Sequence, residues 1–146
     1  MSNLKWKRKI SKIWPMGSGS RKIILLYHSV GDSLWATSTQ HFSEQINWLT
    51  DNCRVLPITD LIHSQPSEDI QVSITFDDGY QNIYEKVAPC FAEKKISGMV
   101  YINTGWMGKD ERHRKQSVAK LVHYPNEQFL NWPKFKKLLY YGWENG

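Results

Sequence analysis

The chain has 146 residues and a mass of 17.1 kDa, which leaves room for one domain of ordinary size. Hydrophobic residues make up 40% of it and charged residues 23%, a composition that excludes a disordered tail or a collagen-like repeat as a description of the chain as a whole. No apolar run approaches the roughly 20 residues that a membrane-spanning helix needs.

The net charge of +5 arises at the N-terminal end of the chain. Residues 1–22 hold seven Lys or Arg and no acid, whereas residues 23–146 hold 12 basic and 14 acidic residues. We expect residues 1–20 to form a flexible basic arm that could weakly contact an anionic membrane surface. The slightly acidic body has neither the charge nor a motif for binding nucleic acid. Polar residues and Pro15 interrupt the apolar stretch that a signal peptide needs, so we expect a cytoplasmic or membrane-surface location.

Cys53 and Cys90 are the two cysteines, and they lie too far apart for a CxxC motif. Their spacing excludes a zinc ribbon and a thioredoxin motif. It is typical of reduced, packed cysteines in a cytosolic chain, although a single disulfide stays open as an alternative.

The sequence of the first half of the chain predicts two strands and two helices. The continuous apolar residues 23–27 predict a strand buried on both faces of a parallel sheet, followed by a loop over residues 28–32. Apolar residues at helical spacing predict a helix over residues 40–51. The remaining elements are a strand at 54–56, a short helix at 59–62 and a polar loop at 65–69.

The second half continues the alternation of strand and helix. Residues 72–76 alternate apolar and polar side chains and predict a strand, which Asp77-Asp78-Gly79 ends. Apolar residues at helical spacing then predict a helix over residues 80–91. The last predicted elements are a strand at 99–102, an irregular stretch at 103–127 and a helix at 129–141 that ends at Gly142. This alternation is typical of an α/β fold, a parallel sheet with helical crossovers.

Asp77 and Asp78 are the most informative pair of side chains in the sequence. They directly follow a predicted parallel strand, and α/β enzymes place their chemistry at the carboxyl ends of such strands. Because successive residues at a strand end point in different directions, one carboxylate could bind a metal cation while the other takes a proton from water. Gly79 allows the chain to turn tightly. The helical periodicity that follows excludes a hairpin turn, and an N-cap role would explain only one of the two aspartates.

The sequence around this pair resembles the polysaccharide deacetylases, the NodB-homology family of carbohydrate esterases. Thr75-Phe76-Asp77-Asp78-Gly79-Tyr80 is similar to the first motif of that family. Other segments are similar, in the same order, to the branch of the family that acts on poly-N-acetylglucosamine-like polymers. They are residues 26–30, 41–46, 54–58, 100–105 and 131–139. The resemblance covers residues 21–146, and it identifies them as the N-terminal part of a deacetylase domain.

The resemblance implies a partial (β/α) barrel of about four parallel strands, with fewer units than an eight-fold barrel. It implies that Asp77 is the general base and that Asp78 is a ligand of a divalent metal, usually zinc. The reaction implied is removal of N-acetyl groups from an acetylated amino-sugar polymer by metal-activated water. His28 and Tyr80 are further candidates for lining the site or binding substrate. His28 follows a predicted strand and would lie on the same face of the barrel as Asp78.

The sequence lacks the remaining parts of such a site. Three protein ligands are typical of a catalytic zinc, and the family takes two of them from an HxxxH motif after a strand that resembles residues 142–146. The sequence stops at Gly146, before any such motif. We therefore expect a truncated domain that is inactive or impaired, binds zinc weakly and leaves one sheet edge open. The other histidines do not have the required spacing and are expected to be solvated; they are His41, His63, His113 and His123.

Two other functions stay open. A pseudo-deacetylase could bind acetylated glycans without hydrolysing them, and seven Trp and seven Tyr would suit stacking on sugars. A small doubly wound domain could bind a nucleotide or another phosphorylated ligand, but no GxGxxG motif follows a strand. The sequence predicts no defined protein partner.

Overall fold

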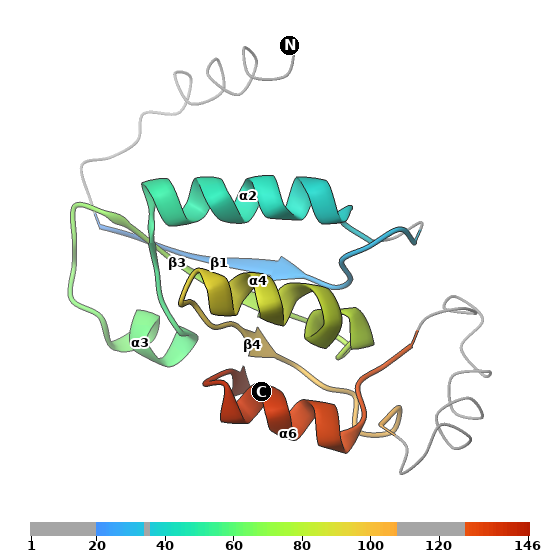
Figure 1. Ribbon diagram of the computed structural model, residues 1–146. Coiled ribbons are helices and arrows are strands. Elements are labelled where there is room, and N and C mark those ends of the chain that lie inside the picture. The colour runs from blue at the N-terminus through green and yellow to red at the C-terminus, as the bar shows by residue number, and fades with distance from the viewer. Residues whose placement is uncertain (1–19, 34–35, 108–127) are drawn as a thin grey trace.

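The computed structural model describes residues 20–33, 36–107 and 128–146 (Figure 1). The predicted basic arm, apart from Ser20, lies outside the described residues, so its contact with a membrane surface stays a prediction. The same holds for most of the predicted irregular stretch, including His113 and His123. In the parts of the chain that the structure describes, no helix is both long and apolar enough to cross a membrane.

Five parallel strands form one sheet within these described ranges. Strand β3 (Ile70–Phe76) is central, and β1 (Arg21–Tyr27) pairs with it along its whole length. The short strands β2 (Arg54–Val55) and β4 (Met99–Val100) pair with the beginning and the end of β3. Strand β5 (Glu144–Asn145) pairs with β4. The predicted parallel α/β sheet is confirmed, with one short strand more than the four expected and with β4 shorter than predicted.

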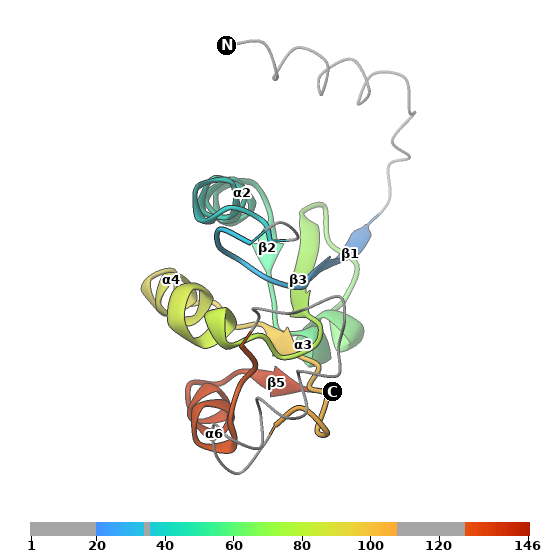
Figure 2. The same cartoon turned by 90° about the vertical axis from the view of Figure 1, so that its right-hand side faces the viewer.

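Helices cover the sheet mainly on one face. The helices α2 (Thr39–Asn52), α4 (Ala88–Glu93) and α6 (Trp132–Tyr140) lie on that face, whereas α3 (Ile58–His63) lies on the other (Figure 2). A short π-helix, η1 (Ile83–Val87), leads directly into α4. Because every strand is parallel and the helices form the crossovers, the carboxyl ends of the strands meet at one end of the sheet.

The π-helix replaces part of the regular helix predicted over residues 80–91. Pro89 has no amide hydrogen, and its ring would clash with the carbonyl group four residues earlier in a regular α-helix. The amide of Ala88 donates instead to the carbonyl oxygen of Ile83, five residues back. The predicted apolar face is nevertheless confirmed, since its residues are buried except for the half-buried Tyr84.

Capping residues set the ends of α6. The side-chain oxygen of Asn131 accepts a hydrogen bond of 2.9 Å from the amide of Lys134, so the helix begins at Trp132 and not at residue 129. Phe129 forms a β-bridge instead. Gly142 follows the helix with a φ of 82°, a left-handed conformation that favours glycine, as the sequence predicted.

An aromatic cluster fills the core between the sheet and the helices. Phe76 of β3 lies 6.1 Å from Phe42, 5.9 Å from Phe91 and 5.7 Å from Trp143 between ring centroids. These three rings come from α2, from α4 and from the segment after α6. Burial of each ring contributes about 1.5–3 kcal/mol, so this cluster holds the three segments on one face of the sheet.

Strand β1 is more exposed than predicted. Ile23, Ile24 and Leu26 are 39%, 53% and 54% exposed, so the prediction of a strand buried on both faces is wrong. Within the described ranges β1 pairs with β3 alone, and α2 covers only one of its faces, through contacts such as that between Tyr27 and Phe42. The apolar run therefore indicated a strand correctly but not its surroundings.

Candidate active site

The ends of β1 and β3 bring two distant segments of the sequence together. The two strands are parallel, and Tyr27 lies beside Phe76 in the register. One residue further on, the backbone amide of Asp77 donates a hydrogen bond of 2.9 Å to the carbonyl oxygen of Tyr27. His28 and Asp77 therefore leave the sheet from neighbouring positions at the carboxyl ends of their strands.

Asp78 and Gly79 turn the chain away from the sheet in a left-handed conformation, with φ values of 66° and 65°. At Gly79 a side chain would be strained by this φ and would also lie 3.1 Å from Ile102. A left-handed conformation costs a non-glycine residue about 1–2 kcal/mol, although Asp tolerates it better than most. Strain of this kind is concentrated at functional sites, which makes Asp78 a candidate for chemistry.

The surroundings of Asp78 control its ionisation. Burial raises the pKa of this half-buried carboxyl above its ordinary value, and the nearby negative charge of Asp77 raises it further, whereas the positive charge of His28 lowers it. The register of β1 and β3 brings these three residues to the same end of the sheet. His28 itself is exposed, so the carboxylate pair and the imidazole are open to solvent on one side.

Residues 128–131 brace the turn from the other side. The amide of Leu130 donates to the carbonyl oxygen of Gly79, and the amide of Gln81 donates to the carbonyl oxygen of Gln128, both at 2.8 Å. Between these two hydrogen bonds, Tyr80 and Phe129 form an antiparallel bridge with ring centroids 5.0 Å apart. The segment before α6 therefore fixes the residues that follow the carboxylate pair.

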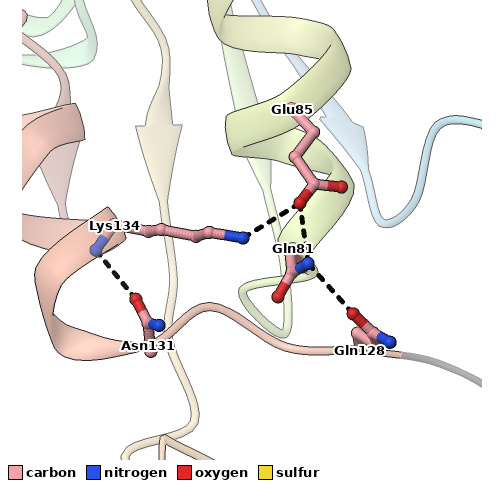
Figure 3. Close-up of polar contacts among 5 residues, drawn as sticks. All are labelled: Gln81, Glu85, Gln128, Asn131 and Lys134. Atoms are coloured by element: carbon pink, nitrogen blue, oxygen red, sulfur yellow. Dashed lines mark hydrogen bonds and ion pairs between the residues drawn. The ribbon is translucent and has the colours of Figure 1, made fainter.

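A polar network extends this brace to α6 (Figure 3). The side-chain amide of Gln81 donates to Glu85 at 2.7 Å and to Gln128 at 3.0 Å. The ammonium group of Lys134 reaches the same oxygen of Glu85 at 2.9 Å, and this hydrogen bond is the main reason why the pKa of Glu85 is lowered. The network joins the first turns of two helices that are about fifty residues apart in the sequence.

The structure brings three of the four predicted site residues together. Asp77, Asp78 and His28 meet at the strand ends. Tyr80 is only 2% exposed and packs against Phe129 in the core, where it anchors the turn. Its predicted role in lining the site or binding substrate stays a prediction. Of the remaining histidines, His41 and His63 are exposed on α2 and α3, as expected.

The donors near the turn are of the kinds that bind zinc, but they are too few for a complete site. Asp78 could supply one carboxylate oxygen, and a catalytic zinc typically has three protein ligands. In the parts of the chain that the structure describes, no group of three His, Cys, Asp or Glu side chains could hold a metal ion. Cys53 and Cys90 are free, half-buried thiols whose pKa values are raised by burial.

Two features of this site had no direct signal in the sequence. One is the brace formed by residues 128–131, because an antiparallel bridge between distant residues leaves no local pattern. The other is Asn82, which makes hydrogen bonds with the loop that follows β1. Its position in the first turn after the Asp-Asp-Gly sequence is the only local hint.

Comparison with protein families matches residues 64–144 to the family described as polysaccharide deacetylase. The matched range is more than half of the chain and includes Asp77 and Asp78. The chain belongs to the polysaccharide deacetylase family, and the resemblance seen in the sequence is confirmed. A search of curated protein sequences gave no match.

Solved structures support the same fold. IcaB from Ammonifex degensii matches with 22% identity and a TM-score of 0.67 over 88% of this chain and 53% of that chain. A de-N-acetylase from Aggregatibacter actinomycetemcomitans matches with 21% identity and a TM-score of 0.67, over 86% and 53% of the two chains. The deacetylase domain of BpsB from Bordetella bronchiseptica matches with 20% identity and a TM-score of 0.60, over 89% and 54%. The chain thus has the fold of part of these proteins and spans about half of their length.

Proposed function

We propose that this chain carries the carboxylate pair of a metal-dependent polysaccharide de-N-acetylase, with Asp77 as the general base and Asp78 as a metal ligand. The observation that carries the proposal is the position of the pair: two half-buried aspartates follow the central strand, at the turn where the chain becomes left-handed. They also lie inside the range that matches the family.

The chemistry proposed for Asp77 is proton transfer. Its carboxylate takes a proton from a water molecule while the water oxygen forms a bond to the carbonyl carbon of an N-acetyl group. The C–N bond then breaks, the nitrogen receives a proton, and acetate and a free amine are released. The hydrogen bond between the Asp77 amide and Tyr27 fixes the backbone of this residue, which favours a defined position for its carboxylate.

The metal proposed for Asp78 is a divalent cation. The resemblance to the deacetylase family implies that this cation is usually zinc. When bound, such a cation would act as a Lewis acid and lower the pKa of a bound water molecule. Asp78 must be ionised to bind it; burial raises the pKa of this carboxyl, and the positive charge of His28 offsets part of that rise. Because the described residues offer no group of three ligands, we expect this chain alone to bind zinc weakly and to release acetate slowly or not at all.

The substrate proposed is an acetylated amino-sugar polymer. The family match supports this class, and two of the similar solved structures are described as a de-N-acetylase and a deacetylase domain. Short N-acetylglucosamine oligomers are the practical probe for this class of polymer.

Acetate release from these oligomers tests the proposal, with zinc present and with a chelator. The variants are Asp77→Asn and Asp78→Asn, and Asp51→Asn, an exposed residue of α2, is the matched control. Release that needs zinc and both site aspartates would support the assignment and contradict the expected impairment of this chain. Release that survives Asp77→Asn would overturn the assignment of the base.

A non-catalytic glycan-binding function is the second candidate, and exposed aromatic rings favour it. Trp132 at the start of α6 is 38% exposed, and Tyr140 and Tyr141 at its end are 87% and 59% exposed. Such rings could stack on sugars. Oligomer binding that persists with Asp78→Ala and with a chelator would favour this function over the enzymatic one.

A further inference from the structure

Asn82 connects the segment of the carboxylate pair to the loop that follows β1. Its side-chain nitrogen donates a hydrogen bond of 2.7 Å to the hydroxyl oxygen of Ser29, and its side-chain oxygen accepts one of 3.3 Å from the amide of Val30. One side chain therefore makes hydrogen bonds with a hydroxyl group and a backbone amide that lie more than fifty residues away in the sequence.

These hydrogen bonds are shielded from water. Ser29 is 4% exposed and Val30 is fully buried. Loss of the Asn82 side chain would leave the buried amide of Val30 without this partner, and an unsatisfied buried donor costs more than the hydrogen bond itself contributes. The amide of Thr37 also donates to the carbonyl oxygen of Ser29 at 2.9 Å, so the loop is held from both sides.

The loop held in this way carries His28. His28 directly precedes Ser29, and it leaves β1 beside Asp77, because Tyr27 lies next to Phe76 in the register and accepts the hydrogen bond of the Asp77 amide. Asp78 lies four residues before Asn82, in the turn at the start of the same helix. Lys86 adds a weaker contact to the same loop, an exposed ion pair of 3.7 Å with Asp32.

We propose that Asn82 is a positioning residue, which fixes His28 relative to Asp78 by binding the loop at Ser29 and Val30. The inference rests on the proposed function, because it takes Asp78 as the residue around which the site is built. Asn82 is not proposed to contact the reacting atoms. It acts through the loop that it holds.

The test compares Asn82→Leu with Gln81→Leu in the full chain, without metal or substrate. Both variants place a leucine on the same turn, but the Gln81 side chain donates hydrogen bonds to Glu85 and Gln128, whereas the Asn82 side chain bonds to Ser29 and Val30 of the loop. The first readout is hydrogen exchange at the amide of Val30, which we expect to accelerate about tenfold or more in Asn82→Leu and to stay unchanged in Gln81→Leu.

The second readout uses NMR to measure whether a change at Asp78 is still felt by the imidazole of His28. Asp78→Asn should displace the imidazole resonances of His28 in the parent chain and in the Gln81→Leu background, and this displacement should largely disappear in the Asn82→Leu background. A merely structural contribution would lower stability without removing this coupling. If Asn82→Leu does not fold, Ser29→Ala removes one of the two hydrogen bonds and should reduce the same displacement.

The proposal is overturned if the displacement persists in Asn82→Leu, or in Ser29→Ala where that variant replaces it, or if Gln81→Leu removes it equally. Neither readout involves zinc or glycan, so failure of the proposed enzymatic function would appear only in the acetate and zinc experiments. The two outcomes are therefore separable.

Discussion

The backbone amide of Asp77 donates a hydrogen bond to the carbonyl oxygen of Tyr27, and through it the pairing of β1 and β3 continues one residue beyond the strands. The parallel pairing and this contact together place His28 and the carboxylate pair at the same end of the sheet. The left-handed turn at Asp78 and Gly79 then directs the chain into the next helix. The site is thus defined by the register of two strands.

Asp78→Asn is expected to stabilise the fold at neutral pH. The pKa of Asp78 is raised in the folded state, mainly by burial, so its ionised form is less favourable there than in the unfolded chain. As the pH falls from this raised pKa to below the ordinary pKa of an aspartate, Asp78 becomes protonated in the folded and the unfolded chain, and the difference in stability between variant and parent should vanish. Asn also tolerates the left-handed φ.

Urea unfolding of parent and variant between pH 3 and pH 8 measures this difference. Asp51→Asn, on an exposed turn of α2, is the control for removal of one negative charge. A variant less stable than the parent at neutral pH, or a difference that grows as the pH falls, would contradict the account.

Glu144→Gln is expected to destabilise the junction between β5 and α3. The two carboxylate oxygens of Glu144 accept hydrogen bonds from the amides of Ile58 at 2.6 Å and Thr59 at 3.1 Å. The amide of Gln can replace only one of these acceptors, so we expect a loss of about 1 kcal/mol in the free energy of unfolding. Glu93→Gln, at the exposed end of α4, should change it little, and equal effects of the two variants would refute this assignment.

Gly98→Ala is expected to weaken the packing between β3 and the end of the chain. A methyl group at this position would lie 3.1 Å from the carbonyl oxygen of Ile74 and 3.1 Å from the ring of Trp143. Overpacking of this kind costs about 1–3 kcal/mol. At Gly105 a methyl group would meet, among the residues that the structure describes, only Asn103, at 3.4 Å, so Gly105→Ala is the matched control in thermal unfolding. An unchanged midpoint for Gly98→Ala would show that this contact is not tight.

Local patterns in the sequence were sufficient to predict the strand that precedes Asp77 and the apolar face of the helix that follows. They were also sufficient for α2, because its apolar spacing and its capping Ser38 are both local signals. The environment of β1 could not be predicted in this way. An apolar run indicates a strand, whereas its burial depends on which elements pack against it.

Long-range contacts explain the other differences. Phe129 was predicted to begin the last helix, but it forms a bridge with Tyr80, and α6 begins at Trp132 instead. This bridge joins two residues that are 49 positions apart in the sequence. The π-helix depends on how Pro89 is accommodated in a helix that tertiary packing holds in place. Asn82 looked like an ordinary helical residue until the structure placed Ser29 beside it.

A zinc titration followed by NMR shows whether Asp78 is a metal ligand in the site at the end of β3. We expect weak binding that displaces the amide resonances of residues 77–79, that is lost in Asp78→Asn and that is retained in Asp51→Asn. Displacements that are the same in Asp78→Asn as in the parent chain, or that are absent from residues 77–79, would contradict it.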